Sequence, residues 1–154
     1  MYNTLLALHS LTRWLVLISL LYALYRAYRG WFRKLPFSRF DNTLRHTTAT
    51  IAHVQLVIGI GLYVVSPLIA YFLSQYKDAV HQREVRFFGM EHSVTMLLAV
   101  VFITIGSAKA KRKQTDPEKF KTMAIWFTLA LLIILLVIPW PFSPFASRPY
   151  MRHF

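Results

Sequence analysis

Four apolar stretches dominate this sequence, and each has about the length that a helix needs to cross a membrane. A helix rises 1.5 Å per residue, so about 20 residues span the roughly 30 Å of hydrocarbon in a bilayer. The stretches cover approximately residues 4–25, 47–66, 87–107 and 122–138. Little chain remains for a separate soluble domain. We therefore predict an all-α fold, an integral membrane four-helix bundle in which residues 1–154 form a single domain.

The composition agrees with a membrane protein. The 154 residues are 56% hydrophobic and 16% charged, with a mean hydropathy of +0.43. Soluble domains are about 45–50% apolar and about 25% charged. The first stretch is too long, and its start too poor in basic residues, for a cleaved signal peptide, so we expect it to be retained. The chain has no cysteine, which excludes disulfides, thiolate-bound zinc, iron–sulfur clusters and c-type haem attachment.

The basic residues are concentrated in two of the loops that join the apolar stretches. Twelve lysines and arginines lie between the first and second stretches or between the third and fourth, and five lie on the other side. Cytoplasmic loops carry an excess of Lys and Arg. We therefore predict both termini outside (N-out/C-out) and the basic loops in the cytoplasm. The formal charge of +12 is then explained by topology and by anionic lipid headgroups, not by nucleic acid.

The outer connection between the second and third stretches is the one sizeable outer loop. Residues 68–86 include the amphipathic sequence LIAYFLSQYKDAV, with Tyr71, Phe72 and Tyr76 among its aromatic residues. This pattern is compatible with a short helix that lies on the membrane surface. Pro67, just before it, is expected to end or kink the second span.

Three histidines lie inside the apolar stretches: His9, His53 and His92. An ionisable ring at bilayer depth is a candidate for function, and imidazole is a common ligand of metals and of haem iron. From the helical rise, we place His9 and His92 both about 8 Å below the outer surface and His53 about 20 Å below it. His9 and His92 therefore form a level pair. The alternative for each ring is a structural hydrogen bond across a helix interface.

A level pair of imidazoles on facing helices is the arrangement that a six-coordinate b-type haem requires. Gly89, one turn before His92, leaves space that a porphyrin face could occupy. Arg13 and Glu91 are the other ionisable residues at this depth. They could pair with each other, or Arg13 could meet a haem propionate while Glu91 supports an imidazole N–H. The deeper His53 could bind a second haem, line a quinone pocket or make a structural hydrogen bond.

Several segments resemble small four-helix membrane proteins of Bacteroidota that are labelled cytochrome b-like. The segments are LHSLTRWLVL, AHVQLVIGIGLYVVSP, MEHSVTMLLAVVFITIG with the basic run after it, and IPWPF. The similarity covers most of the chain and is weakest in the outer loop and the tail. The label implies haem b. The chain is more loosely similar to other four-helix haem-binding units with paired histidines, such as the halves of haem A synthase, whose histidines are placed differently.

The leading functional hypothesis is a b-type cytochrome or haem-binding electron-transfer subunit with His9 and His92 as axial ligands. Electrons would pass between a quinone or a periplasmic carrier and a partner protein, in a larger membrane complex or a homo-oligomer. One alternative is a non-catalytic accessory subunit of such a complex. Another is a small transporter or proton-relay element that uses Glu91, Arg13 and His53. The sequence contains no glycine-rich phosphate loop, HExxH motif or carboxylate cluster, each of which would indicate a particular chemistry. Whether the protein is an enzyme stays open.

Overall fold

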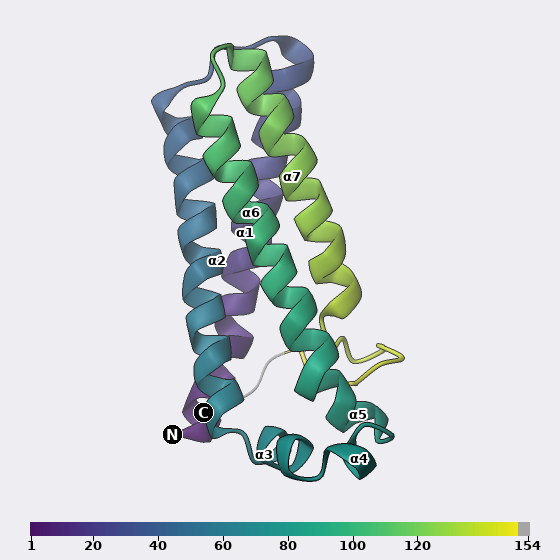
Figure 1. The fold of residues 1–154 in the computed structure, drawn as a ribbon. Coiled ribbons are helices and arrows are strands. Elements are labelled where there is room, and N and C mark those ends of the chain that lie inside the picture. The colour runs from purple at the N-terminus through teal and green to yellow at the C-terminus, as the bar shows by residue number, and fades with distance from the viewer. Residues whose placement is uncertain (151–154) are drawn as a thin grey trace.

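The computed structural model describes residues 1–150, and most of them belong to helices (Figure 1). The long helices are α1 (Tyr2–Arg33), α2 (Arg39–Val65), α6 (His92–Arg112) and α7 (Asp116–Val137). Shorter elements join α2 to α6: α3 (Pro67–Ser74), α4 (Tyr76–Ala79), α5 (Arg83–Arg86) and a π-helical turn at Phe87–Glu91. No strand occurs within residues 1–150. The predicted all-α helical bundle is confirmed.

Four helical segments are long and apolar enough to cross a membrane: α1, α2, the continuous segment Arg83–Arg112, and α7. Most are longer than the predicted stretches. For example, α1 continues to Arg33, well past residue 25. The extra turns are rich in Arg, Lys and aromatic residues, which continue a helix readily and lie well at a membrane interface. The architecture fits a multi-pass membrane protein.

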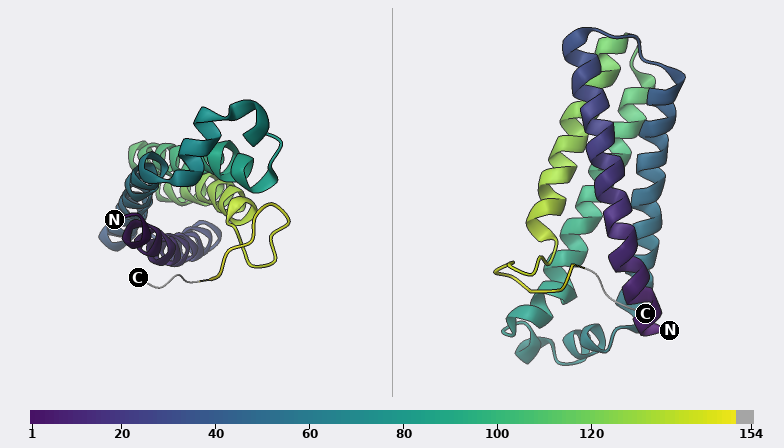
Figure 2. Two further views of the ribbon diagram at one scale, coloured as in Figure 1. Left: turned by 90° about the horizontal axis from the view of Figure 1, so that it is seen from below. Right: turned by 180° about the vertical axis from the view of Figure 1, so that it is seen from behind.

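The bundle has two different ends (Figures 1 and 2). The connections at residues 34–38 and 113–115 lie together at one end, which we call the basic end. The N-terminus, α3 to α5 and the tail that follows α7 lie at the opposite end, which we call the terminal end. The predicted short helix between the second and third spans is α3, with Pro67 in its first turn and Phe72 buried.

The start of α2 is fixed by a capping box at the basic end. The Ser38 hydroxyl accepts a hydrogen bond from the Asp41 backbone N–H, and the Asp41 carboxylate accepts one from the Ser38 N–H. This arrangement satisfies two of the amide donors that a helix start leaves free. The Asp41 side chain also pairs with Arg26 of α1 at 2.8 Å and is 1% exposed. The cap therefore also ties α2 to α1.

Close helix packing in the basic half depends on glycine. The Gly106 position of α6 lies against Trp126 of α7, and a Cβ placed there would overlap the Trp126 side chain. Phe120 covers Gly30 of α1 in the same way. Small residues at helix interfaces let backbones approach closely. The interfaces of α7 with α1 and with α6 are therefore tightly packed in the basic half.

We expect Gly106→Ala to lower the free energy of unfolding by about 1–3 kcal/mol, because the added methyl group overpacks the interface between α6 and α7. Gly61→Ala is the matched control, since its Cβ would meet only Leu5 Cδ1, at 3.9 Å. Thermal unfolding in detergent measures both variants. Equal melting temperatures for the two would contradict the packing described here.

Candidate functional site

A cavity of about 460 Å³ lies among α1, α2, α6 and the end of α7. Most of its lining is aliphatic, and its polar lining includes His9, Arg13, Gln55 and His92. Ile60 of α2 and Val94 and Leu97 of α6 line this cavity and are also exposed on the outside of the bundle. The cavity therefore opens sideways between α2 and α6, on the face that lipid would cover. Its volume lies within the range of small-molecule and cofactor sites, about 300–1,000 Å³.

His9 and His92 meet in this cavity. Their ring centroids lie 6.4 Å apart, and the ring planes are inclined by 69°. His9 comes from α1 and His92 from the first residue of α6. The structure thus brings together the two rings that the sequence places at one depth. Two imidazoles that bind one metal in line, each nitrogen about 2 Å from it, have ring centres about 6 Å apart.

A backbone carbonyl orients the His92 ring. His92 Nδ1 lies 3.1 Å from the carbonyl oxygen of Val137, at the end of α7. The carbonyl only accepts, so Nδ1 carries the hydrogen and Nε2 keeps its lone pair. Such a bond fixes the tautomer and the direction of a metal-binding histidine. The His92 side chain is also flanked by Phe87 and Phe88, with ring centroids 5.6 and 5.9 Å away.

The His9 ring lies against Gly59 of α2. A Cβ at Gly59 would lie 3.3 Å from His9 Cε1, so glycine leaves room for the ring. Gln55, one turn earlier, donates from Nε2 to the His9 carbonyl oxygen at 3.0 Å and also contacts Thr12. His9 Nδ1 is buried and has no hydrogen-bond partner within residues 1–150. Buried polar atoms nearly always have a hydrogen-bond partner. A buried nitrogen without one is therefore a candidate for contact with a ligand.

Two guanidinium groups line the same cavity, from Arg13 and Arg148. Arg13 Nη2 donates to the carbonyl oxygen of Tyr150 in the tail, and its Nε is buried without a partner in the part of the chain that the structure describes. Arg148 pairs with Glu84 and stacks over Phe88, 4.8 Å from the ring centroid. Guanidinium groups bind carboxylates well, so this end of the cavity suits an anionic group.

Several features of the cavity are ones that a haem site would use. The two imidazoles have a spacing suited to a shared metal, His9 Nδ1 and Arg13 Nε lack partners, and Gly59 makes room beside His9. Within residues 1–150, no group of three or more His, Cys, Asp or Glu side chains could hold a metal ion. Haem differs from a bare ion because its macrocycle supplies the equatorial nitrogens, and the protein supplies only axial ligands.

One of the two arrangements considered for Arg13 and Glu91, the pairing of these residues with each other, is wrong. Glu91 Oε1 instead accepts from Arg86 Nε at 2.7 Å. The two residues are five positions apart, and the intervening turn is π-helical, a form in which residues bond at i and i+5. In an α-helix, side chains three and four apart share a face. The π turn therefore joins Glu91 to Arg86 and leaves Arg13 to the tail.

The predicted role of Gly89 is also wrong. A Cβ at Gly89 would overlap the ring of Phe72, so α3 and not a cofactor covers this position. The Gly89 carbonyl oxygen accepts from the Tyr63 hydroxyl at 2.9 Å, which links α2 to the π turn. Gly59 is the glycine that makes space for an imidazole.

His53 lies apart from the His9–His92 pair. It does not line the cavity, its side chain is exposed, and its Nε2 lies 2.9 Å from the Thr104 hydroxyl of α6. Of the roles considered for His53, the structural hydrogen bond is the one that this contact supports. The other two roles considered for His53, binding a second haem or lining a quinone pocket, stay predictions.

One residue of the site, Arg148, could not be found from the sequence. Gln55 is a polar side chain within an apolar span, which is a usable signal for a functional position. Gly59 and Gly61 could each leave room for a porphyrin face, and the sequence alone does not distinguish between them. Arg148 comes from an irregular tail without any pattern that would place it at the cavity.

Comparison with protein-family models, with curated proteins and with solved structures finds no match for this chain.

Proposed function

We propose that this protein is a b-type cytochrome of a bacterial inner membrane, an electron-transfer subunit that binds haem between His9 and His92. The observation that carries the proposal is the spacing of these two imidazoles, 6.4 Å between centroids, in a mostly apolar cavity. The basic loops would face the cytoplasm, as their charge favours. The terminal end and its cavity would then lie near the periplasmic side.

In this proposal the chain positions each part of the cofactor. His92, held by the Val137 carbonyl, presents Nε2, and His9 is the second axial ligand. Arg13 and Arg148 would bind the propionates. When bound, haem supplies a one-electron redox centre. Electrons would pass through the haem between a quinone or a periplasmic carrier and a partner protein. That partner would belong to a larger membrane complex or be a second copy of this chain.

The surroundings also set the reduction potential. An apolar cavity disfavours the additional positive charge of oxidised haem, and a nearby guanidinium group disfavours it further. We therefore expect Arg13→Gln to lower the midpoint potential by about 50 mV, a value on the order of the Coulomb energy between two partly screened charges. A potentiometric titration measures the shift. Arg83→Gln, which changes an arginine outside the cavity lining at the same end, should leave the potential unchanged.

The space beside His9 provides a direct test of the proposal. We expect Gly59→Leu to lower the haem-to-protein ratio severalfold, because its side chain would displace the His9 ring and occupy part of the cavity. Gly61→Leu is the matched control, two residues further along α2, where the nearest atom is Leu5 Cδ1 at 3.9 Å. Equal haem content in the two variants would contradict the assignment of this cavity as the haem site.

One contact favours the second candidate, a non-catalytic accessory subunit. The bond from His92 to Val137 joins α6 to α7, and such a bond can serve helix packing alone. Under this alternative, His92→Ala would alter stability or assembly with no spectroscopic change, whereas under the cytochrome proposal it removes the haem absorbance.

A further inference from the structure

A second cavity lies at the basic end, at the opposite end of the bundle from His9 and His92. It has a volume of about 460 Å³ and lies between the first turn of α2 and the facing ends of α6 and α7. Three basic residues line it: Arg39, Lys111 and Lys119. Ser38 and Thr43 add hydroxyl groups, and no acidic residue belongs to the lining. Apart from Phe37, the cavity is therefore lined by polar and positively charged residues.

The positive charge at this cavity is only partly neutralised. Lys119 pairs with Asp116 at 3.4 Å. Arg39 and Lys111 have no ion-pair partner among the described residues. The nearest buried acid, Asp41, is already bound to Arg26 and to Ser38. The cavity therefore has at least two cations in excess.

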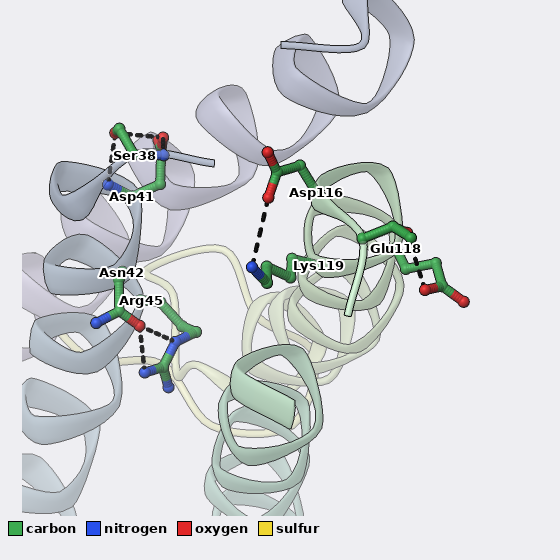
Figure 3. Close-up of polar contacts among 8 residues, drawn as sticks. Ser38, Asp41, Asn42, Arg45, Asp116, Glu118 and Lys119 are labelled. Atoms are coloured by element: carbon green, nitrogen blue, oxygen red, sulfur yellow. Dashed lines mark hydrogen bonds and ion pairs between the residues drawn. The ribbon is translucent and has the colours of Figure 1, made fainter. Parts of the chain in front are cut away.

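A buried arginine lies behind the cavity. Arg45 is 4% exposed and has no acidic partner within residues 1–150. Its guanidinium donates to the Ser107 carbonyl oxygen at 2.9 Å. It also donates to Asn42 Oδ1 at 2.8 Å (Figure 3). A buried charge without a counter-charge is costly. Compensation by an anion bound nearby would lower that cost.

Asn42 connects the buried arginine to the cavity. Its side chain lines the cavity, and its oxygen is occupied by Arg45. Its amide nitrogen is thereby left as a donor. Figure 3 shows Asn42 and Arg45 on α2, with Lys119 of α7 across from them. The start of α2 adds its own positive dipole end. Donors from a helix start, an amide and three basic side chains match the oxygens of a phosphate group.

We propose that this cavity binds the phosphate group of an anionic phospholipid headgroup. The cavity lies at the ends of apolar helices, where headgroups are found in a bilayer. Exposed aromatic side chains surround this end, among them Phe32, which is 70% exposed, and Phe40. Such aromatic residues are typical of the membrane interface. A lipid places its acyl chains along the bundle while its phosphate occupies the cavity. This inference does not depend on haem.

Native mass spectrometry of the whole purified protein tests the proposal, with phosphatidylglycerol or phosphatidylcholine added in detergent. The wild type should retain one phosphatidylglycerol and release phosphatidylcholine. In the double variant Arg39→Gln/Lys111→Gln, the affinity for phosphatidylglycerol should fall about thirtyfold, because each lost basic residue weakens binding by roughly 1 kcal/mol. Arg29→Gln/Lys34→Gln removes the same charge from the same end outside the cavity lining and should change the affinity little.

Two results would overturn the proposal. The first is an equal loss of lipid in both double variants, because binding would then follow net charge and not this cavity. The second is displacement of phosphatidylglycerol by millimolar inorganic phosphate, because the site would then take a soluble phosphate. Circular dichroism confirms that both double variants are folded, and their substituted residues are exposed.

Discussion

Replacement of His92 with alanine is expected to abolish stoichiometric haem binding. The change removes one proposed axial ligand and also the ring that the Val137 carbonyl orients. Loss of only a supporting contact to a metal ligand lowers metal affinity by about 10- to 100-fold, so loss of the ligand itself should exceed about a hundredfold. The measurement is the ratio of haem absorbance to protein absorbance after purification with haem supplementation.

His53→Ala is the control for this change. His53 also lies within a span and also makes an inter-helix hydrogen bond, but it lies outside the cavity. We expect this variant to keep its haem. A His92→Ala protein with a full haem complement would contradict the ligand assignment. Thermal unfolding distinguishes a folded haem-free variant from one that fails to fold.

Asp41→Ala is expected to destabilise the bundle by about 3 kcal/mol. Loss of one partner of a buried ion pair typically costs about 3–5 kcal/mol, and Arg26 is partly exposed, which places the effect at the lower end. The same change removes the acceptor for the Ser38 N–H and hydroxyl at the start of α2. Equilibrium unfolding in detergent measures the loss.

Asp78→Ala provides the comparison for Asp41→Ala. Asp78 is an exposed aspartate of the short α4 and forms no ion pair among the residues that the structure describes. We expect a change within about 0.5 kcal/mol, as for most surface substitutions. If both variants were equally stable, Asp41 would not hold α1 and α2 together as described.

The spans and the nearness of His9 to His92 could be predicted from the sequence because both depend on regular geometry. Hydropathy identifies apolar stretches, and a constant helical rise converts residue number into depth. His9 and His92 were expected at one level and lie with their ring centroids 6.4 Å apart. Helix ends were harder to place, because the arginine-rich and aromatic continuation of α1 is neither fully apolar nor unfavourable to a helix.

The partners of Glu91, Gly89 and Arg13 could not be predicted because they depend on irregular elements. A π turn aligns Glu91 with Arg86, the short α3 brings Phe72 over Gly89, and the tail brings the Tyr150 carbonyl to Arg13. The π turn and the tail have no periodic sequence pattern, and the amphipathic pattern of α3 does not indicate which residue Phe72 covers. A single sequence shows which residues are unusual at membrane depth, but their partners come from tertiary contacts.

The most direct measurement is the visible spectrum of the whole protein in detergent, oxidised and then reduced with dithionite. If His9 and His92 bind one haem, the spectrum will show a Soret band and a sharp α-band on reduction, with about one haem per chain. A colourless protein after haem-supplemented expression would contradict the central claim. So would a bound haem whose spectrum is unchanged when both histidines are replaced.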